Sequence, residues 1–164
     1  MARRAATDAY EIRPLRSPDG HAAREMVGTE LDRTPYKETP QAALESALDR
    51  PGAEYCGVVA VAGHELAGLI LYGLVAGTVG AGRIYLVAVT ASARLRGVAT
   101  TLIDAATRDL KRHHARFAVV EFPDDPMLAA GKALLQRAGF GEVARVKDYF
   151  RDGVDLTFLR RDLT

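Results

Sequence analysis

Residues 83–110 read RIYLVAVTASARLRGVATTLIDAATRDL, an order that predicts a strand, a loop and a helix. The run from Ile84 to Val89 is short, apolar and rich in aromatic and β-branched residues, as buried strands are. Thr90 to Arg96 is polar and small, which is typical of a loop. The residues that follow carry an apolar side chain at every fourth position, namely Val98, Leu102, Ala106 and Leu110. We therefore expect an amphipathic helix of about four turns that packs one stripe on a core.

The junction between this loop and the helix is a predicted anion site. The first turn of a helix has N–H groups without an intrahelical acceptor and carries roughly half a positive charge. Gly97 has no Cβ and Ala99 has only a methyl group, so a phosphate could approach the backbone closely. Arg94 and Arg96 add two cations at the same place. These features predict a diphosphate site built mostly from backbone.

The pattern Arg94-x-x-Gly97-x-Ala99 resembles the signature Q/R-x-x-G-x-G/A of the GNAT superfamily of N-acetyltransferases, which lies between a central strand and a helix. The resemblance implies that these amides hold the pyrophosphate of acetyl-CoA and that the preceding strand pairs with the pantetheine arm. Lys132 stands where some relatives carry a cation for the ribose phosphate. The other cofactor-binding residues expected are Val87, Ala88, Val89, Arg94, Leu95, Arg96, Gly97, Val98, Ala99 and Thr100.

A second marker of the same family lies in the last predicted helix, Met127 to Ala138, which is followed by Gly139 and Phe140. The resemblance places an Asn at the position of Leu128 and a Tyr at that of Leu135. Neither is present. Many members use that Tyr to protonate the departing thiolate, so in this chain the proton would come from another acid or from water.

The third marker is close to the C-terminus. A group of small bacterial GNAT enzymes ends in R-x-x-D-[FY]-[FY]-x-x-G-x-D, and the chain matches this pattern with Arg145, Asp148, Tyr149, Phe150, Gly153 and Asp155. With all three markers in order, the resemblance runs from about residue 10 to residue 163.

The expected fold is of the α/β (α+β) class. It is a mixed, mostly antiparallel sheet of about seven strands flanked by about four helices, as in GNAT proteins. Its one parallel pair joins Ile84 to Val89 with Phe117 to Phe122, with the central helix as a right-handed crossover. The first strand is expected at Tyr10 to Leu15 and a short helix from Pro40. With 164 residues and 48% hydrophobic content, the chain suits one domain spanning residues 1–164.

Composition gives no sign of a nucleic-acid or membrane partner. Lys and Arg together number 22 against 21 for Asp and Glu, and no apolar run reaches the length of a membrane span or a signal peptide. We therefore expect a soluble, cytoplasmic protein. The sequence has no paired Cys or His at metal spacing, so no metal is expected. The single cysteine, Cys56, is interpreted as a small buried hydrophobe and not as a catalytic thiol.

Acetyl transfer to an amine would require a base, an oxyanion donor and a proton for the thiolate. By resemblance, the N–H of Val89 or a close neighbour is the oxyanion donor. Glu121 is the first candidate base, because a carboxylate in an apolar strand would have its pKa raised toward a useful range; an ion pair at the sheet surface is the competing interpretation. Tyr149 is the candidate acid and Tyr85 the second, against structural hydroxyls bonded to backbone.

The sequence therefore predicts an N-acetyltransferase that moves the acetyl group of acetyl-CoA to a primary amine of a small molecule, peptide or protein by direct attack in a ternary complex. The alternative is a non-catalytic acyl-CoA-binding sensor or regulatory domain, which the absent Asn and Tyr keep open. The resemblance places Glu30, Asp32 and Tyr36 beside the acceptor, but exposed charges on solvated helix ends are the favoured interpretation, because nothing in the sequence fixes these residues in a cleft. A homodimer and the identity of the amine are left open.

Overall fold

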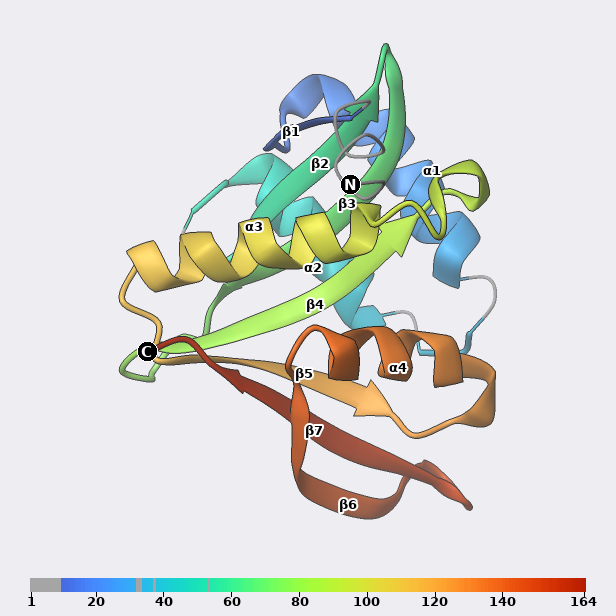
Figure 1. Ribbon diagram of the computed structural model, residues 1–164, viewed down its shortest axis with the longest axis vertical. Helices are drawn as coiled ribbons and strands as arrows, with labels where there is room; N and C mark the ends of the chain where they lie inside the picture. Colours follow the sequence, from blue (N-terminus) through green and yellow to red (C-terminus); the bar gives the residue numbers. More distant parts are fainter. Residues whose placement is uncertain (1–9, 32–33, 37, 53) are drawn as a thin grey trace, which may run out of the picture.

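The structure is a computed structural model that describes residues 10–31, 34–36, 38–52 and 54–164. Within these residues, seven strands form one sheet in the order β1-β2-β3-β4-β5-β7-β6 (Figure 1). All neighbours are antiparallel except β4 and β5. This confirms the predicted mixed sheet with one parallel pair. The strands are β1 Glu11–Pro14, β2 Cys56–Ala62, β3 Glu65–Leu74, β4 Ala81–Val89, β5 Phe117–Pro123, β6 Gly141–Arg151 and β7 Val154–Asp162.

The helices cover the two faces of the sheet (Figure 1). On one face lie α1, Gly20–Leu31, and α2, Glu38–Asp49, whose buried side chains pack on β2, β3 and β4. On the other lie α3, Val98–Arg112, and α4, Ala129–Arg137, which share a second core with the sheet. Short 3-10 turns, η1 Ser17–Asp19, η2 Ala91–Ala93 and η3 Pro126–Leu128, precede α1, α3 and α4.

The central strand–helix stretch folds as its periodicity predicts. The apolar residues of the four-residue step in α3, Val98, Leu102, Ala106 and Leu110, are all at most 2% exposed. β4 begins three residues before Ile84 and includes Gly82. A Cβ at Gly82 would lie 2.9 Å from the Leu110 side chain and 3.1 Å from the Phe117 carbonyl oxygen, so only glycine lets α3 and β5 pack this closely.

The parallel pairing of β4 with β5 is shorter than the sequence predicts. It consists of Ala81, Gly82 and Arg83 opposite residues 117–119, and not of the whole run from Ile84 to Val89. The reason is that β4 stays paired with β3 as far as Val89, while β5 stays paired with β7 as far as Pro123. The sheet therefore divides between β4 and β5, and among the described residues those numbered 84–89 have a strand partner only on their β3 side.

Smaller differences concern element ends. The first strand is Glu11–Pro14 and excludes Tyr10 and Leu15, and α2 begins two residues before Pro40. The last helix begins as the η3 turn, because Asp125 accepts the Met127 N–H at 3.1 Å and caps it.

Candidate active site

Residues 94–100 comprise the turn before α3 and the first three residues of the helix. Two of them are in the left-handed region, Leu95 at φ 60° and Gly97 at φ 79°. Gly97 is the N-cap of α3, and a Cβ built on it would have no heavy atom within 4 Å. Glycine is therefore favoured here by the backbone angle, and the space in front of it is open. Successive backbone N–H groups of a turn can form a concavity that binds anions. We call residues 94–100 the Gly97 turn.

The amides of the Gly97 turn are available to a ligand. The Thr101 N–H donates to the Gly97 carbonyl at 3.0 Å. Within the described part of the chain, the structure shows no acceptor for the N–H groups of residues 95–100. Since α3 adds its dipole at this end, the turn has the features of an anion site, and its binding of a diphosphate stays a prediction.

Arg94 lies at the edge of this turn but points to α1. Its Nη2 is 2.9 Å from Glu30 Oε1, and 43% of its side chain is exposed. A partly exposed ion pair contributes about 0–1 kcal/mol, so Arg94 can exchange Glu30 for a phosphate at small cost. Arg96 and Leu95 are exposed on the same turn. Asp32, which was predicted beside Glu30 at the acceptor, lies outside the described residues.

The strand edge beside the turn comes from β4. Val87 and Val89 pack partly buried on the α3 side, whereas Ala88 is buried on the α1 and α2 side. Alternate backbone groups of residues 84–89 face the side from which β5 has diverged. An extended ligand can therefore pair with this edge and end at the amides of the Gly97 turn.

Glu121 lies just beyond the last parallel pair, where it contacts Arg83. Arg83 Nη2 is 2.9 Å from Glu121 Oε2, and 35% of the Glu121 side chain is exposed. The guanidinium also stacks 4.9 Å above the Tyr85 ring. The structure thus shows the ion pair that competed with the base assignment, and the catalytic role of Glu121 stays a prediction.

The two candidate acids lie in different places. Tyr85 is half-buried beside Arg83, and burial raises the pKa of its phenol above the ordinary value, so the hydroxyl stays protonated at neutral pH. Tyr149 is on β6 and 60% exposed. Across the sheet, Glu121 of β5 pairs with Phe158 of β7, and Phe158 pairs with Ala144 of β6. Tyr149 lies five residues after Ala144 along β6, so it is not level with Glu121. Of the two, only Tyr85 shares a neighbour with Glu121.

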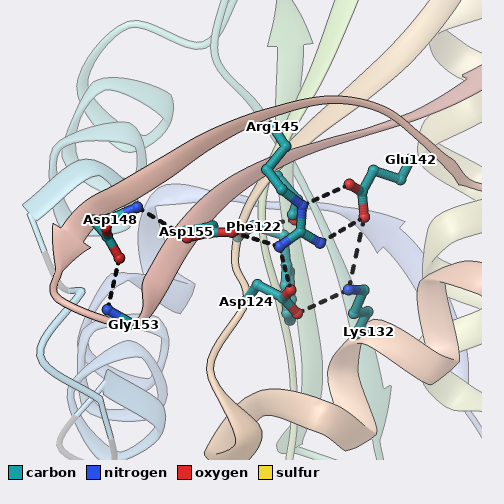
Figure 2. Close-up of polar contacts among 9 residues, drawn as sticks. Phe122, Asp124, Lys132, Glu142, Arg145, Asp148, Gly153 and Asp155 are labelled. Atoms are coloured by element: carbon teal, nitrogen blue, oxygen red, sulfur yellow. Dashed lines mark hydrogen bonds and ion pairs between the residues drawn. The ribbon is translucent and has the colours of Figure 1, made fainter.

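Lys132 lies in a network of charged side chains between α4 and the β6–β7 hairpin (Figure 2). Its Nζ is 2.8 Å from Asp124 Oδ1 and 3.9 Å from Glu142 Oε2. Lys132 and Asp124 line a pocket of about 310 Å³ that Asp125 also lines. The same two carboxylates also contact Arg145, so the charge of the Lys132 ammonium is already paired within this network. The contact of Lys132 with the ribose phosphate remains a prediction.

Three other observations limit the chemistry. Cys56 is half-buried, and burial raises the pKa of its thiol to about 11, so the thiolate nucleophile is absent at neutral pH. The described ranges contain no group of three or more His, Cys, Asp or Glu arranged to hold a metal. No helix in the described part of the chain is long and apolar enough to cross a membrane.

The acetyltransferase (GNAT) family model matches residues 21–140, which include the Gly97 turn, both diverging strands and α4. The chain belongs to the GNAT family. It is therefore an acyltransferase by family.

Solved structures of GNAT proteins share the whole fold. A GNAT-family protein from Desulfovibrio desulfuricans has 24% identity and a TM-score of 0.87, with 95% of this chain and 100% of that chain covered. YncA of Salmonella typhimurium, solved with its cofactor acetyl-CoA, has 19% identity and a TM-score of 0.78 over 95% of each chain. The ribosomal-protein-S18-alanine N-acetyltransferase of Escherichia coli has 16% identity and a TM-score of 0.74 over 94% of each chain. Curated protein sequences give no significant match.

The C-terminal marker of small GNAT enzymes has a structural role in this chain. Arg145 binds Asp155 at 2.7 Å, Asp124 at 2.8 Å and Glu142 at 2.9 Å. Asp155 accepts the Asp148 N–H at 2.9 Å, and Asp148 accepts the Gly153 N–H at 2.8 Å (Figure 2). These contacts shape the end of the β6–β7 hairpin and so fix the backbone that carries Tyr149 and Phe150.

The helix marker differs from the GNAT pattern in chemistry as well as in sequence. Leu135 is 5% exposed and belongs to the core shared by α3 and α4. An apolar side chain that is packed in this way offers no proton, so α4 supplies no acid at this position.

Sequence reasoning missed two residues of this GNAT site. Arg83 was only the polar start of a strand pattern, yet it holds Glu121, and its buried Nε has no partner within the described residues. Such a donor costs about 1–3 kcal/mol, which marks Arg83 for testing. Asp125 has no role in the sequence analysis, yet its side chain is 6% exposed and it joins three segments. Its signal in the sequence is the pair Asp125-Pro126, because Asp is a common helix N-cap and Pro is common at the first helical position.

Proposed function

We propose that the protein transfers the acetyl group of acetyl-CoA to a primary amine of a small molecule, peptide or protein by direct attack in a ternary complex. The supporting observation is the open edge of residues 84–89 in β4, which leads directly to the amides of the Gly97 turn, for which the described residues supply no acceptor. A strand edge that ends at a helix N-terminus suits one long ligand with an amide-bearing arm and a diphosphate.

In this proposal the amides of residues 95–100 and the Arg94 guanidinium bind the diphosphate. The pantetheine arm adds to β4 as an extra strand would, with Val87, Ala88 and Val89 as its partners. The thioester then lies between β4 and β5, where the N–H of Val89 or a close neighbour is aimed at the oxyanion. Val98, Ala99 and Thr100 keep the first turn of α3 small enough for this approach.

Proton transfer would use residues around Arg83. Glu121 accepts the proton of the attacking amine, directly or through a water, and Arg83 holds the carboxylate in place. Tyr85 or Tyr149 gives a proton to the thiolate. Because a thiol has a pKa near 8.5, water can also supply this proton, so the acid contributes less than the base.

The acceptor class is wide at this level. The Escherichia coli relative is named for the alanine of ribosomal protein S18, whereas the YncA structure names no acceptor. Protein N-termini and small amines are therefore both reasonable acceptors for this chain.

The test is a screen for release of the CoA thiol over small amines, amino acids and peptides, with mass spectrometry of the acceptor. Amine-dependent thiol release with an acetylated product is expected. Acetyl-CoA binding in calorimetry without a product from any amine would support the sensor alternative. Absence of acetyl-CoA binding would contradict both functions.

A further inference from the structure

The carboxylate of Asp125 joins three segments that are far apart in the sequence. Its Oδ2 accepts the Tyr36 hydroxyl at 3.0 Å and the Arg151 Nη2 at 3.0 Å. Its Oδ1 accepts the Met127 N–H at 3.1 Å. The connection between α1 and α2, the end of β5 and the tip of the β6–β7 hairpin therefore meet at one side chain. We call Tyr36, Asp125, Phe150 and Arg151 the Asp125 cluster.

Aromatic rings extend this cluster to the surface. The Tyr36 ring lies 4.7 Å from the Phe150 ring, and Phe150 lies 5.0 Å from Tyr149 in an edge-to-face arrangement. Phe150 is 36% exposed and Tyr149 is 60% exposed. The hairpin therefore presents a continuous aromatic wall, partly open to solvent and partly packed on Tyr36.

The Asp125 cluster is more than a surface ion pair. The Asp125 side chain is 6% exposed, and all three of its donors come from within the protein. A buried carboxylate must be satisfied, so loss of one donor leaves part of its charge without a hydrogen-bond partner. The Arg24–Glu45 pair is a useful contrast, because both of its side chains are more than half exposed.

The cluster lies at the end of the sheet where the reaction would take place. Asp125 follows the carboxyl end of β5 by two residues, and the Gly97 turn follows the carboxyl end of β4. These two strands are parallel, so both ends lie at the same edge of the sheet. Figure 1 shows the arrowheads of β4 and β5 and the first turns of α3 and α4 at this edge. The exposed rings therefore flank the position where an amine would meet the thioester.

We propose that Asp125 is a positioning residue that holds Tyr36 against Phe150 as the wall of the acceptor site, and that this wall selects amines that carry an apolar or aromatic group beside the amino group. Aromatic faces favour apolar bodies, and the charge of the Arg151 guanidinium beside them is already paired with Asp125. The inference rests on the proposed transferase function, since it assigns the acceptor side of that site. A purely structural cluster would fasten the hairpin and leave acceptor choice unaffected.

The acceptor panel is a set of peptides and matched amines that differ only in the group beside the primary amine: benzyl, isobutyl, hydroxymethyl, carboxyethyl or aminobutyl. The wild-type enzyme should show a kcat/KM at least tenfold higher for benzyl and isobutyl than for carboxyethyl. Phe150→Ala should reduce this preference to less than threefold. The KM for acetyl-CoA should stay within twofold of wild type in the same variant.

Two further variants separate positioning from folding. Tyr36→Phe keeps the ring on Phe150 and removes only the hydroxyl, while Asp125→Asn keeps the shape and removes the charge. Each should raise the acceptor KM severalfold with little change in the KM for acetyl-CoA, and the two together should be less than multiplicative. Glu45→Gln, which breaks the exposed pair with Arg24, is the control and should leave both KM values unchanged.

The outcomes distinguish this inference from the proposed function. If acetyl-CoA does not bind, the transferase function fails. If acetyl-CoA binds but the benzyl and isobutyl amines are neither acetylated nor bound in ligand-detected NMR, the aromatic wall is overturned. Turnover with an unchanged preference among the acceptor amines in Phe150→Ala and Tyr36→Phe overturns the aromatic wall as well. Asp125 would then only hold the β6–β7 hairpin in place.

Discussion

The Gly97 turn and the Asp125 cluster lie at the same edge of the sheet, but the first consists of backbone groups and the second of side chains. The first is backbone: two left-handed residues and the free amides of a helix start. The second is side chains from three segments, joined by one buried carboxylate. In our proposals the backbone turn holds the part of the substrate that is common to all GNAT enzymes, and the side-chain cluster holds the part that differs.

This difference predicts where substitutions act. A change in the Gly97 turn should alter cofactor affinity for every acceptor. A change near Glu121 should alter rate, and a change at the hairpin should alter acceptor choice. The experiments below test this division, beginning with the largest expected effect.

Gly97→Glu should abolish acetyl-CoA binding, measured by calorimetry. The substitution places a carboxylate in the open space in front of the amides, where it repels the diphosphate. It also forces an L-residue to adopt φ 79°, which costs roughly 1–2 kcal/mol.

Gly77→Glu is the matched control for this strain, because Gly77 has φ 77° and open space around its Cβ position. Both variants should lose similar thermal stability, and only Gly97→Glu should lose the cofactor. Near-normal affinity of Gly97→Glu for acetyl-CoA would contradict the proposal that the Gly97 turn binds the diphosphate.

Glu121→Gln should lower kcat by about 100-fold with the KM for acetyl-CoA unchanged, since it keeps the shape and removes the proton acceptor. The acidic limb of the pH–rate profile should disappear with it. Arg83→Met removes the partner instead and should lower kcat less, because a carboxylate remains. If Arg83→Met and Glu121→Gln change only thermal stability, and by equal amounts, the pair is structural.

The sequence predicted the backbone half of this comparison well and the side-chain half poorly. Periodicity placed α3, and the glycine pattern placed the turn, because both depend on local residue order. The early end of the β4–β5 pairing depends on which neighbour each strand keeps, and that is decided by contacts across the sheet. The bond from Tyr36 to Asp125 spans 89 residues, so no local pattern could reveal it.

The marker near the C-terminus illustrates the same limit. The sequence singled out Arg145, Asp148, Gly153 and Asp155 by resemblance but gave them no physical role. Their hydrogen bonds show that they support the hairpin, and that the aromatic pair between them is what the hairpin presents.

Arg94→Ala should weaken CoA binding by about 1–2 kcal/mol, the scale of one charge-assisted hydrogen bond. The loss should be smaller than that scale if Glu30 holds the arginine in the complex as it does here. Calorimetry with CoA and dephospho-CoA locates the contact: equal losses of affinity place Arg94 on the diphosphate.

Lys132→Ala should weaken the binding of CoA more than that of dephospho-CoA. An equal effect on both would leave Lys132 as the partner of Asp124.

The smallest effect should come from the acid, and it separates the two tyrosines. Tyr85→Phe and Tyr149→Phe each keep the ring. The variant that removes the hydroxyl of the true acid should lose about threefold to tenfold in kcat, because water can replace it.

A phenol donates only while protonated, so its contribution to the rate falls as the pH rises through its pKa. Burial raises the pKa of Tyr85, so this loss would begin only above about pH 10, the ordinary value for tyrosine. A wild-type rate that stays level to pH 9.5, together with a loss in Tyr85→Phe alone, would assign the proton to the residue that shares Arg83 with Glu121. A loss of rate in Tyr149→Phe alone would instead place the acid on the hairpin, and chemistry and acceptor choice would then share one element.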